Sequence, residues 1–220
     1  MSRIKRRSGN AVTEFCSLIG WEPSLVFQVG VGRHDETDCF LEKWPEVELI
    51  GCDPIQPSNY PGNFHQCLIA DSFGKAPFYV LGGHKDGSSM FVPASRKRPV
   101  MEIHAEVRKL DSFAPGSNCL LWLDCEGAEQ SALYSGRELF LSGVKMINVE
   151  MTGFPRVPNK PRPLDIHGFL ERMGFLKTWV HTTRSCRGQF DAIYVKEELF
   201  DPRFCSDPAS HRKWLQNFRR

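Results

Sequence analysis

Residues 120–129, with the sequence LLWLDCEGAE, decide how the rest of the chain is interpreted. Four residues suited to a strand buried on both faces lead directly into Asp124, Glu126 and Glu129, which are grouped around a glycine. Ligands of open α/β sheets bind beyond the carboxyl ends of the strands, so we expect Asp124 to lie at a functional site. For Glu126 and Glu129 the alternative is a structural role in the first turn of a helix, where the helix dipole favours negative charge.

A strand, a glycine turn and a helix come earlier in the chain. Residues 24–29 have the apolar character of a buried strand, and residues 30–34 (GVGRH) form a turn before the helix. A second strand at 47–51 ends just before Asp53. This order is that of a nucleotide-binding βαβ unit, in which an acid after the second strand accepts hydrogen bonds from ribose hydroxyls. A nicotinamide dinucleotide site would have a third glycine where this chain has Asp35, so that fingerprint is incomplete.

The rest of the chain continues the alternation of helices and strands. Further helices are predicted at 11–19, up to about residue 44, at 130–141 and at 165–173, and further strands at 64–69, 78–81, 102–110, 145–149, 175–181 and 190–196. Residues 82–98 carry glycine and proline breaks and are predicted to form a long loop that acts as a lid. The length favours one domain over residues 1–220, with an arm and helix at 1–20 and a surface tail at 201–220.

The composition is that of a soluble globular protein, with 41% hydrophobic residues, 25% charged residues and a net charge of +2. The basic runs lack an accompanying aromatic or motif framework, so no nucleic-acid partner is predicted. No apolar segment reaches the ~18 residues of a membrane span, and no signal core follows the basic N-terminus, so we expect neither membrane contact nor export. The eight cysteines include no Cys-x-x-Cys pair and several lie in apolar strands, which favours a reducing cytoplasm.

In this order the motifs resemble those of the FkbM family of S-adenosylmethionine-dependent methyltransferases. The resemblance covers residues 24–196 and is strongest at 120–129, which is similar to the family's apolar strand followed by Asp-x-Glu-Gly-x-Glu. The glycine turn, the pair Asp53-Pro54, the acidic turn at 71–74 and the serines within 88–90 also follow the family's order.

The resemblance implies an α/β fold of the Rossmann-like class I methyltransferase type: a seven-stranded, mostly parallel sheet with helices on both faces and an antiparallel strand near one edge. It also implies S-adenosylmethionine as the cofactor. The predicted cofactor-binding residues are Gln28, Gly30, Gly32, Asp53, Asp71 and Ser72. Of these, the two glycines are expected beneath the methionine part, Asp53 at the ribose and Asp71 at the adenine.

The implied reaction is methyl transfer from the cofactor to a nucleophile, most often a hydroxyl in this family. We therefore predict an O-methyltransferase that acts on a small molecule or a glycan. Asp124 is predicted to position or deprotonate the acceptor, with Glu126 nearby and Glu150 at the end of the adjacent strand. An ordinary aspartate is a weak base for an alcohol, so burial or crowding has to raise its pKa. No metal site is predicted; a divalent ion held by these oxygens is the alternative.

Departures from the family pattern motivate a second hypothesis. Members usually carry an acid at the position of Gln28, an asparagine at Gly32 and a glycine at His34. The second hypothesis is a cofactor-binding or interaction module of the same fold with weak or no turnover. A third, a nicotinamide oxidoreductase, is disfavoured by Asp35.

Overall fold

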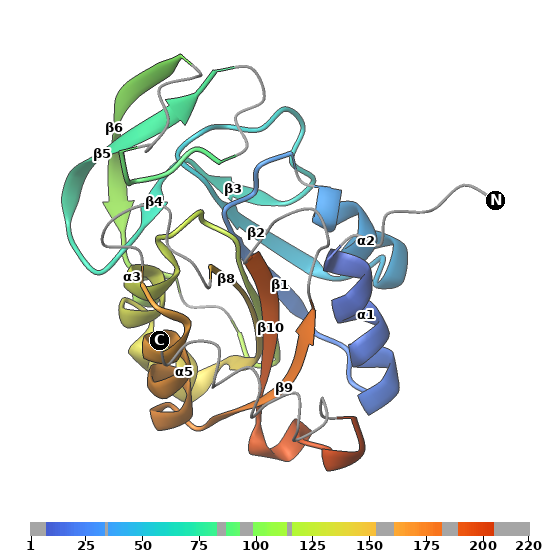
Figure 1. Ribbon diagram of the computed structural model, residues 1–220. Coiled ribbons are helices and arrows are strands. Elements are labelled where there is room, and N and C mark those ends of the chain that lie inside the picture. The colour runs from blue at the N-terminus through green and yellow to red at the C-terminus, as the bar shows by residue number, and fades with distance from the viewer. Residues whose placement is uncertain are drawn as a thin grey trace.

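The computed structural model describes residues 8–33, 35–82, 87–92, 99–113, 116–152, 161–181 and 189–204. Its centre is a seven-stranded sheet in the order β3-β2-β1-β7-β8-β10-β9 (Figure 1). The strands are β1 (Leu25–Val29), β2 (Glu48–Cys52), β3 (Asn63–His65), β7 (Cys119–Leu123), β8 (Val144–Thr152), β9 (Phe175–His181) and β10 (Gln189–Lys196). Strand β10 is antiparallel to both of its neighbours, whereas the pairs from β3 to β8 are parallel. The predicted fold class is therefore confirmed.

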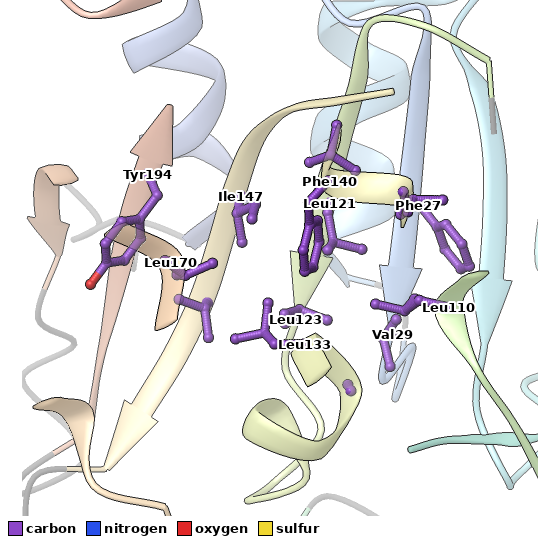
Figure 2. Close-up of a cluster of buried hydrophobic side chains, with 14 of the residues drawn as sticks. Phe27, Val29, Leu110, Leu121, Leu123, Leu133, Phe140, Ile147, Leu170 and Tyr194 are labelled. Carbon is purple, nitrogen blue, oxygen red and sulfur yellow. The ribbon is translucent and has the colours of Figure 1, made fainter. Parts of the chain in front are cut away.

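Helices cover both faces of this sheet. On one face lie α1 (Ser8–Ile19) and α2 (Asp35–Lys43), and on the other lie α3 (Glu129–Tyr134), α4 (Arg137–Ser142) and α5 (Pro163–Arg172) (Figure 1). Figure 2 shows the second face, where Leu121 of β7 and Ile147 of β8 pack near Leu133, Phe140 and Leu170 of the three helices. All five residues of β7 are buried, because apolar layers enclose the strand from both sides. This explains why residues 120–123 form a continuous apolar run.

A second, three-stranded sheet lies beside the main one (Figure 1). It has the order β4-β6-β5 and consists of β4 (Leu68–Ile69), β5 (Gly74–Leu81) and β6 (Val100–Arg108). The prediction of one strand at 64–69 was wrong, because the chain pairs with β2 up to His65 and then joins the small sheet from Leu68. Of the predicted loop at 82–98, residues 87–92 are described, and Ser89 forms an antiparallel bridge with Tyr79 of β5. Residues 83–86 and 93–98 lie outside the described residues.

The helix predicted at 130–141 is two helices, α3 and α4, separated at Ser135 and Gly136. The Ser135 hydroxyl accepts a hydrogen bond from the backbone N–H of Leu110 at 3.0 Å. A Cβ atom at Gly136 would come within 2.9 Å of the Leu110 side chain. The prediction was wrong because the chain bends here to pack against Leu110, a contact between distant segments.

Short 3-10 helices complete the fold: η1 (Leu110–Ser112), η2 (Glu197–Leu199) and η3 (Pro202–Phe204). The predicted tail at 201–220 is described only as far as residue 204, where η3 contacts β9. Among the described helices, none has both the length and the apolar character needed to cross a bilayer.

Candidate active site

The glycine turn after β1 passes directly against the chain that follows β7. Gly30 has a φ of 83°, and a Cβ atom there would lie 1.8 Å from the carbonyl oxygen of Asp124. The Gly30 N–H donates to Cys52 O at 2.9 Å, and the Asp124 N–H donates to Val29 O at 3.0 Å. The ends of three strands are thereby joined, and only glycine fits at position 30.

Asp53 follows β2 and contacts the same turn. Its Oδ2 accepts hydrogen bonds from the N–H groups of Val31 at 3.0 Å and Gly32 at 3.2 Å. Its Oδ1 accepts a third from Ile55 at 2.8 Å. The residue predicted to bind ribose therefore lies beside the glycine turn, and in this structure its carboxylate orders that turn. Its role toward a ribose stays a prediction.

A cavity of about 590 Å³ opens at this edge of the sheet. It is lined by the glycine turn, the ends of β2 and β4, part of the small sheet and the turn after β7. Of the predicted site residues, Gly30, Gly32, Asp53, Asp124 and Glu126 line it. The apolar part of the lining includes Ile55, Leu68, Ile69 and Phe78. The cavity therefore combines an apolar wall with a strongly acidic one.

The three carboxylates predicted to be catalytic lie close together: Asp124 and Glu126 line the cavity, and Glu150 lies behind them outside its lining. Carboxylate oxygens of Asp124, Glu126 and Glu150 all lie within 4.8 Å of one another. Asp124 and Glu126 come from the turn after β7, and Glu150 comes from the adjacent strand β8. Their convergence follows from parallel pairing, which places the carboxyl ends of β7 and β8 side by side.

Burial and mutual repulsion shift the protonation of this cluster. Burial raises the pKa of Asp124 well above its usual range, and the charges of Glu126 and Asp191 raise it further. Burial also raises the pKa of Glu150 to about 11, with smaller contributions from Asp124 and Glu126. Carboxylates this close cannot all ionise at neutral pH, so they share protons. An ionised carboxylate in such a group is a stronger base than an isolated aspartate.

Glu129 holds the turn in shape. Its side chain is 4% exposed, and its Oε1 accepts hydrogen bonds from the N–H groups of Cys125 at 3.1 Å and Gly127 at 2.9 Å. These contacts support the interpretation of Glu129 as a structural acid at the start of α3. Glu126, in contrast, has a φ of 53° and lines the cavity.

Gln28 is not among the residues that line the cavity. Its side chain is 1% exposed and lies on the α1–α2 side of the sheet. Its Oε1 accepts hydrogen bonds from the hydroxyls of Thr37 and Tyr60, both at 2.8 Å. Tyr60 occupies this position because Gly51 has no side chain; a Cβ there would come within 2.7 Å of the tyrosine ring.

Asp71 and Ser72, predicted to bind the cofactor, are exposed and also lie outside the cavity lining. Asp71 forms an ion pair with Lys109 at 2.8 Å, and its N–H donates to the hydroxyl of Ser131 at 3.0 Å. The contacts of Gln28, Asp71 and Ser72 with a cofactor remain predictions.

Two further acids contribute to the site and were not predicted. Glu36 in α2 lines the cavity, and Asp191 in β10 is the register partner of Glu150. Both raise the pKa of Asp124. Asp191 had a detectable signal, because it is the one acid within the apolar run 190–195. Glu36 gave no such signal in the sequence, because an acid in the first turn of a helix is common.

Comparison with known protein families shows which family the chain belongs to. A sequence profile described as the methyltransferase FkbM domain matches residues 22–177, which is most of the protein. The chain belongs to the FkbM methyltransferase family. A search with this FkbM-family sequence among curated proteins finds no match.

Solved structures share the fold of this FkbM-family protein at low identity. Magnesium protoporphyrin IX methyltransferase from Synechocystis PCC 6803, with bound SAM, has a TM-score of 0.52 and 11% identity, over 86% of this chain and 78% of that one. An FkbM methyltransferase from Methylobacillus flagellatus KT has a TM-score of 0.50 and 11% identity, over 77% and 42%. The plantazolicin methyltransferase BpumL, in complex with a substrate analogue and SAH, has a TM-score of 0.50 and 10% identity, over 86% and 83%. These similarities show the class I methyltransferase fold.

Proposed function

We propose that this FkbM-family protein is an S-adenosylmethionine-dependent O-methyltransferase that acts on a hydroxyl of a small molecule or a glycan. The observation that carries the proposal is the convergence of Asp124, Glu126 and Glu150 beside the turn that contains Gly30. The glycine turn suits a cofactor, and the carboxylates suit a group that must lose a proton.

The cavity fits S-adenosylmethionine in size and chemistry. Its volume of about 590 Å³ lies within the range of small-molecule sites. Gly30 keeps the backbone surface open where a side chain would overlap Asp124. Asp53 offers carboxylate oxygens suited to ribose hydroxyls, and Leu68, Ile69 and Phe78 offer an apolar surface suited to a purine. The bound SAM and SAH of two structural neighbours support the same cofactor here.

When bound, the cofactor supplies a methyl group activated by a positively charged sulfur. The chain's own residues then have two tasks. Asp124 orients the acceptor hydroxyl and takes its proton, while Glu126 and Glu150 share the proton within the cluster. Orientation of the acceptor hydroxyl in line with the methyl group contributes roughly 7–11 kcal/mol in favourable cases.

Two measurements test the proposal. Calorimetry with S-adenosylhomocysteine measures cofactor binding, and incubation with methyl-labelled S-adenosylmethionine measures transfer to a panel of hydroxylated small molecules and glycans. In Asp124→Asn we expect transfer to fall at least about 100-fold while S-adenosylhomocysteine affinity is largely kept. The matched control is Asp165→Asn on α5, where the carboxylate pairs with Arg162. Unchanged transfer in Asp124→Asn would show that another group acts as the base.

The second candidate is a cofactor-binding module of the same fold with weak or no turnover. Gln28 favours it, because the buried amide lies outside the lining of the cavity that would hold the cofactor. Binding of S-adenosylhomocysteine without transfer to any acceptor in the panel would select this candidate. The six described cysteines are free thiols, which supports our proposal of a reducing, cytoplasmic location.

A further inference from the structure

The described segment 87–92 is attached to the small sheet. The N–H of Tyr79 in β5 donates to Ser89 O at 2.8 Å, and the N–H of Ser89 donates to Tyr79 O at 3.1 Å. The Leu81 N–H donates to the hydroxyl of Ser88 at 3.1 Å. Three hydrogen bonds thus fix this segment to one strand of the small sheet.

The hydroxyl of Ser89 extends this attachment to the acidic wall of the cavity. It donates to the carbonyl oxygen of Glu126 at 2.8 Å and accepts a hydrogen bond from Phe91 N–H at 3.1 Å. Ser89 is 7% exposed, so little water competes for these bonds. The serines within 88–90 belong to the motifs that resemble the family pattern. The proposed methyl transfer gives them no function.

The peptide that Ser89 contacts has an unfavourable conformation. Glu126 has a φ of 53°, in the left-handed region that residues other than glycine rarely adopt. The peptide between Glu126 and Gly127 is held on both sides: the Glu126 carbonyl by Ser89, and the Gly127 N–H by Glu129 at 2.9 Å. A strained backbone conformation of this kind persists only where several surrounding contacts hold it, and it is common at functional sites.

We propose that Ser89 is a positioning residue, which holds Glu126 in its left-handed conformation and thereby keeps the Glu126 carboxylate beside Asp124 and Glu150. The small sheet then controls the geometry of a cluster that belongs to the main sheet. The competing explanation is that the hydroxyl only closes the local turn to Phe91. The two explanations differ in what removal of the hydroxyl does to the cluster.

Protonation of Glu150 reports the position of Glu126, since the charge of Glu126 contributes to the raised pKa of Glu150. Among the residues that the structure describes, the charged groups that act on Glu150 are Asp124 and Glu126 after β7, Glu129 in α3 and Asp191 in β10, and Glu36 of α2 acts on Asp124. Only Glu126 is expected to move when the hydroxyl of Ser89 is removed.

The test is a carbon-13 NMR titration of the full chain labelled at glutamate carboxyl carbons, with the Glu150 signal assigned by its loss in Glu150→Gln. In Ser89→Ala we expect the Glu150 pKa to fall by more than about one unit, because one nearby charge moves away. Ser89→Thr retains the hydroxyl and should restore the wild-type titration.

The matched control is Ser135→Ala. Ser135 is also buried, and its hydroxyl also donates to a carbonyl, Ala132 O at 2.7 Å, and accepts from a backbone N–H, that of Leu110. This variant loses the same kinds of bond away from the cluster, so its Glu150 titration should match wild type.

A wild-type Glu150 titration in folded Ser89→Ala would overturn the proposal. If Ser89→Ala does not fold, Ser89→Cys, which has a similar size and a weaker donor, takes its place, and a wild-type titration there is equally decisive. The inference rests on the proposed function because it concerns the same site. The titration needs neither cofactor nor acceptor, so failure to detect methyl transfer would leave its outcome unaffected.

Discussion

Replacement of Glu150 by glutamine is expected to stabilise the protein at neutral pH. Burial and nearby carboxylates raise the pKa of Glu150 to about 11 in the folded chain, whereas a glutamate in an unfolded chain titrates near ~4.3. Between these values the folded state keeps a proton that the unfolded state has lost. The free energy of unfolding therefore falls as pH rises through this window, and it is highest below the unfolded pKa.

The size of the effect follows from the same shift. A difference of one bound proton changes the free energy of unfolding by about 1.4 kcal/mol for each pH unit. From the unfolded pKa to neutral pH, Glu150 therefore lowers the free energy of unfolding by about 4 kcal/mol. The side chain is partly exposed, so solvent screening reduces the expected value to about 2 kcal/mol. Glutamine has nearly the shape of the protonated acid, so the packing around position 150 is kept.

Urea unfolding followed by tryptophan fluorescence at several pH values between about 5 and 8 measures this effect. Glu150→Gln should unfold at higher urea concentration than wild type, with the difference increasing as pH rises. Glu197→Gln, at an exposed position in η2, is the control and should follow wild type. If the free energy of unfolding varied with pH in the same way in wild type and Glu150→Gln, the conclusion that Glu150 is protonated in the folded chain would be refuted.

Two further predictions concern the turn and the acid cluster. Gly30→Ala places a Cβ 1.8 Å from Asp124 O, so we expect a loss of more than about 2 kcal/mol in the free energy of unfolding and no S-adenosylhomocysteine binding by calorimetry. Gly32→Ala meets no atom within 4 Å and should lose only about 1 kcal/mol from its positive φ; equal effects would contradict the close contact at Gly30. Methyl transfer is expected to survive dialysis against a chelator, and a loss restored by Mg²⁺ would instead assign a cation to the acid cluster.

The sequence together with its resemblance to the FkbM family was sufficient to predict the main sheet and its central acids. The run 120–123 is apolar throughout because β7 is buried on both faces, and this pattern is readable without a structure. Glu150 was placed beside Asp124 because parallel neighbours end at the same edge of a sheet. Asp191 was not predicted to lie there, because β10 runs antiparallel to β8 and the start of β10 lies at that edge. Strand direction is a property of the whole fold, which a local pattern does not contain.

The small sheet and the break between α3 and α4 were not predictable for a related reason. Strands at 78–81 and 102–110 were recognised as segments, but their assembly into a separate sheet depends on pairing between β5 and β6 over a long separation in the chain. The bend at Gly136 depends on the position of Leu110. Local propensity gives the elements, and contacts between distant residues decide how they join and where they end.

Gln28 differs in charge, and not in shape, from the acid that the family pattern has at this position. Its hydrogen bonds show why. The family resemblance leads to the expectation of an acid there, and a glutamate oxygen would accept the same two hydrogen bonds from the hydroxyls of Thr37 and Tyr60. Glutamate at position 28 would, however, add a charge in a buried position on the same face of the sheet as Asp124. With several acids already at the end of that face, the neutral amide keeps the hydrogen-bond network and spares the folded chain another buried anion. We therefore expect Gln28→Glu to raise the pKa of Asp124 further while the packing around position 28 is kept.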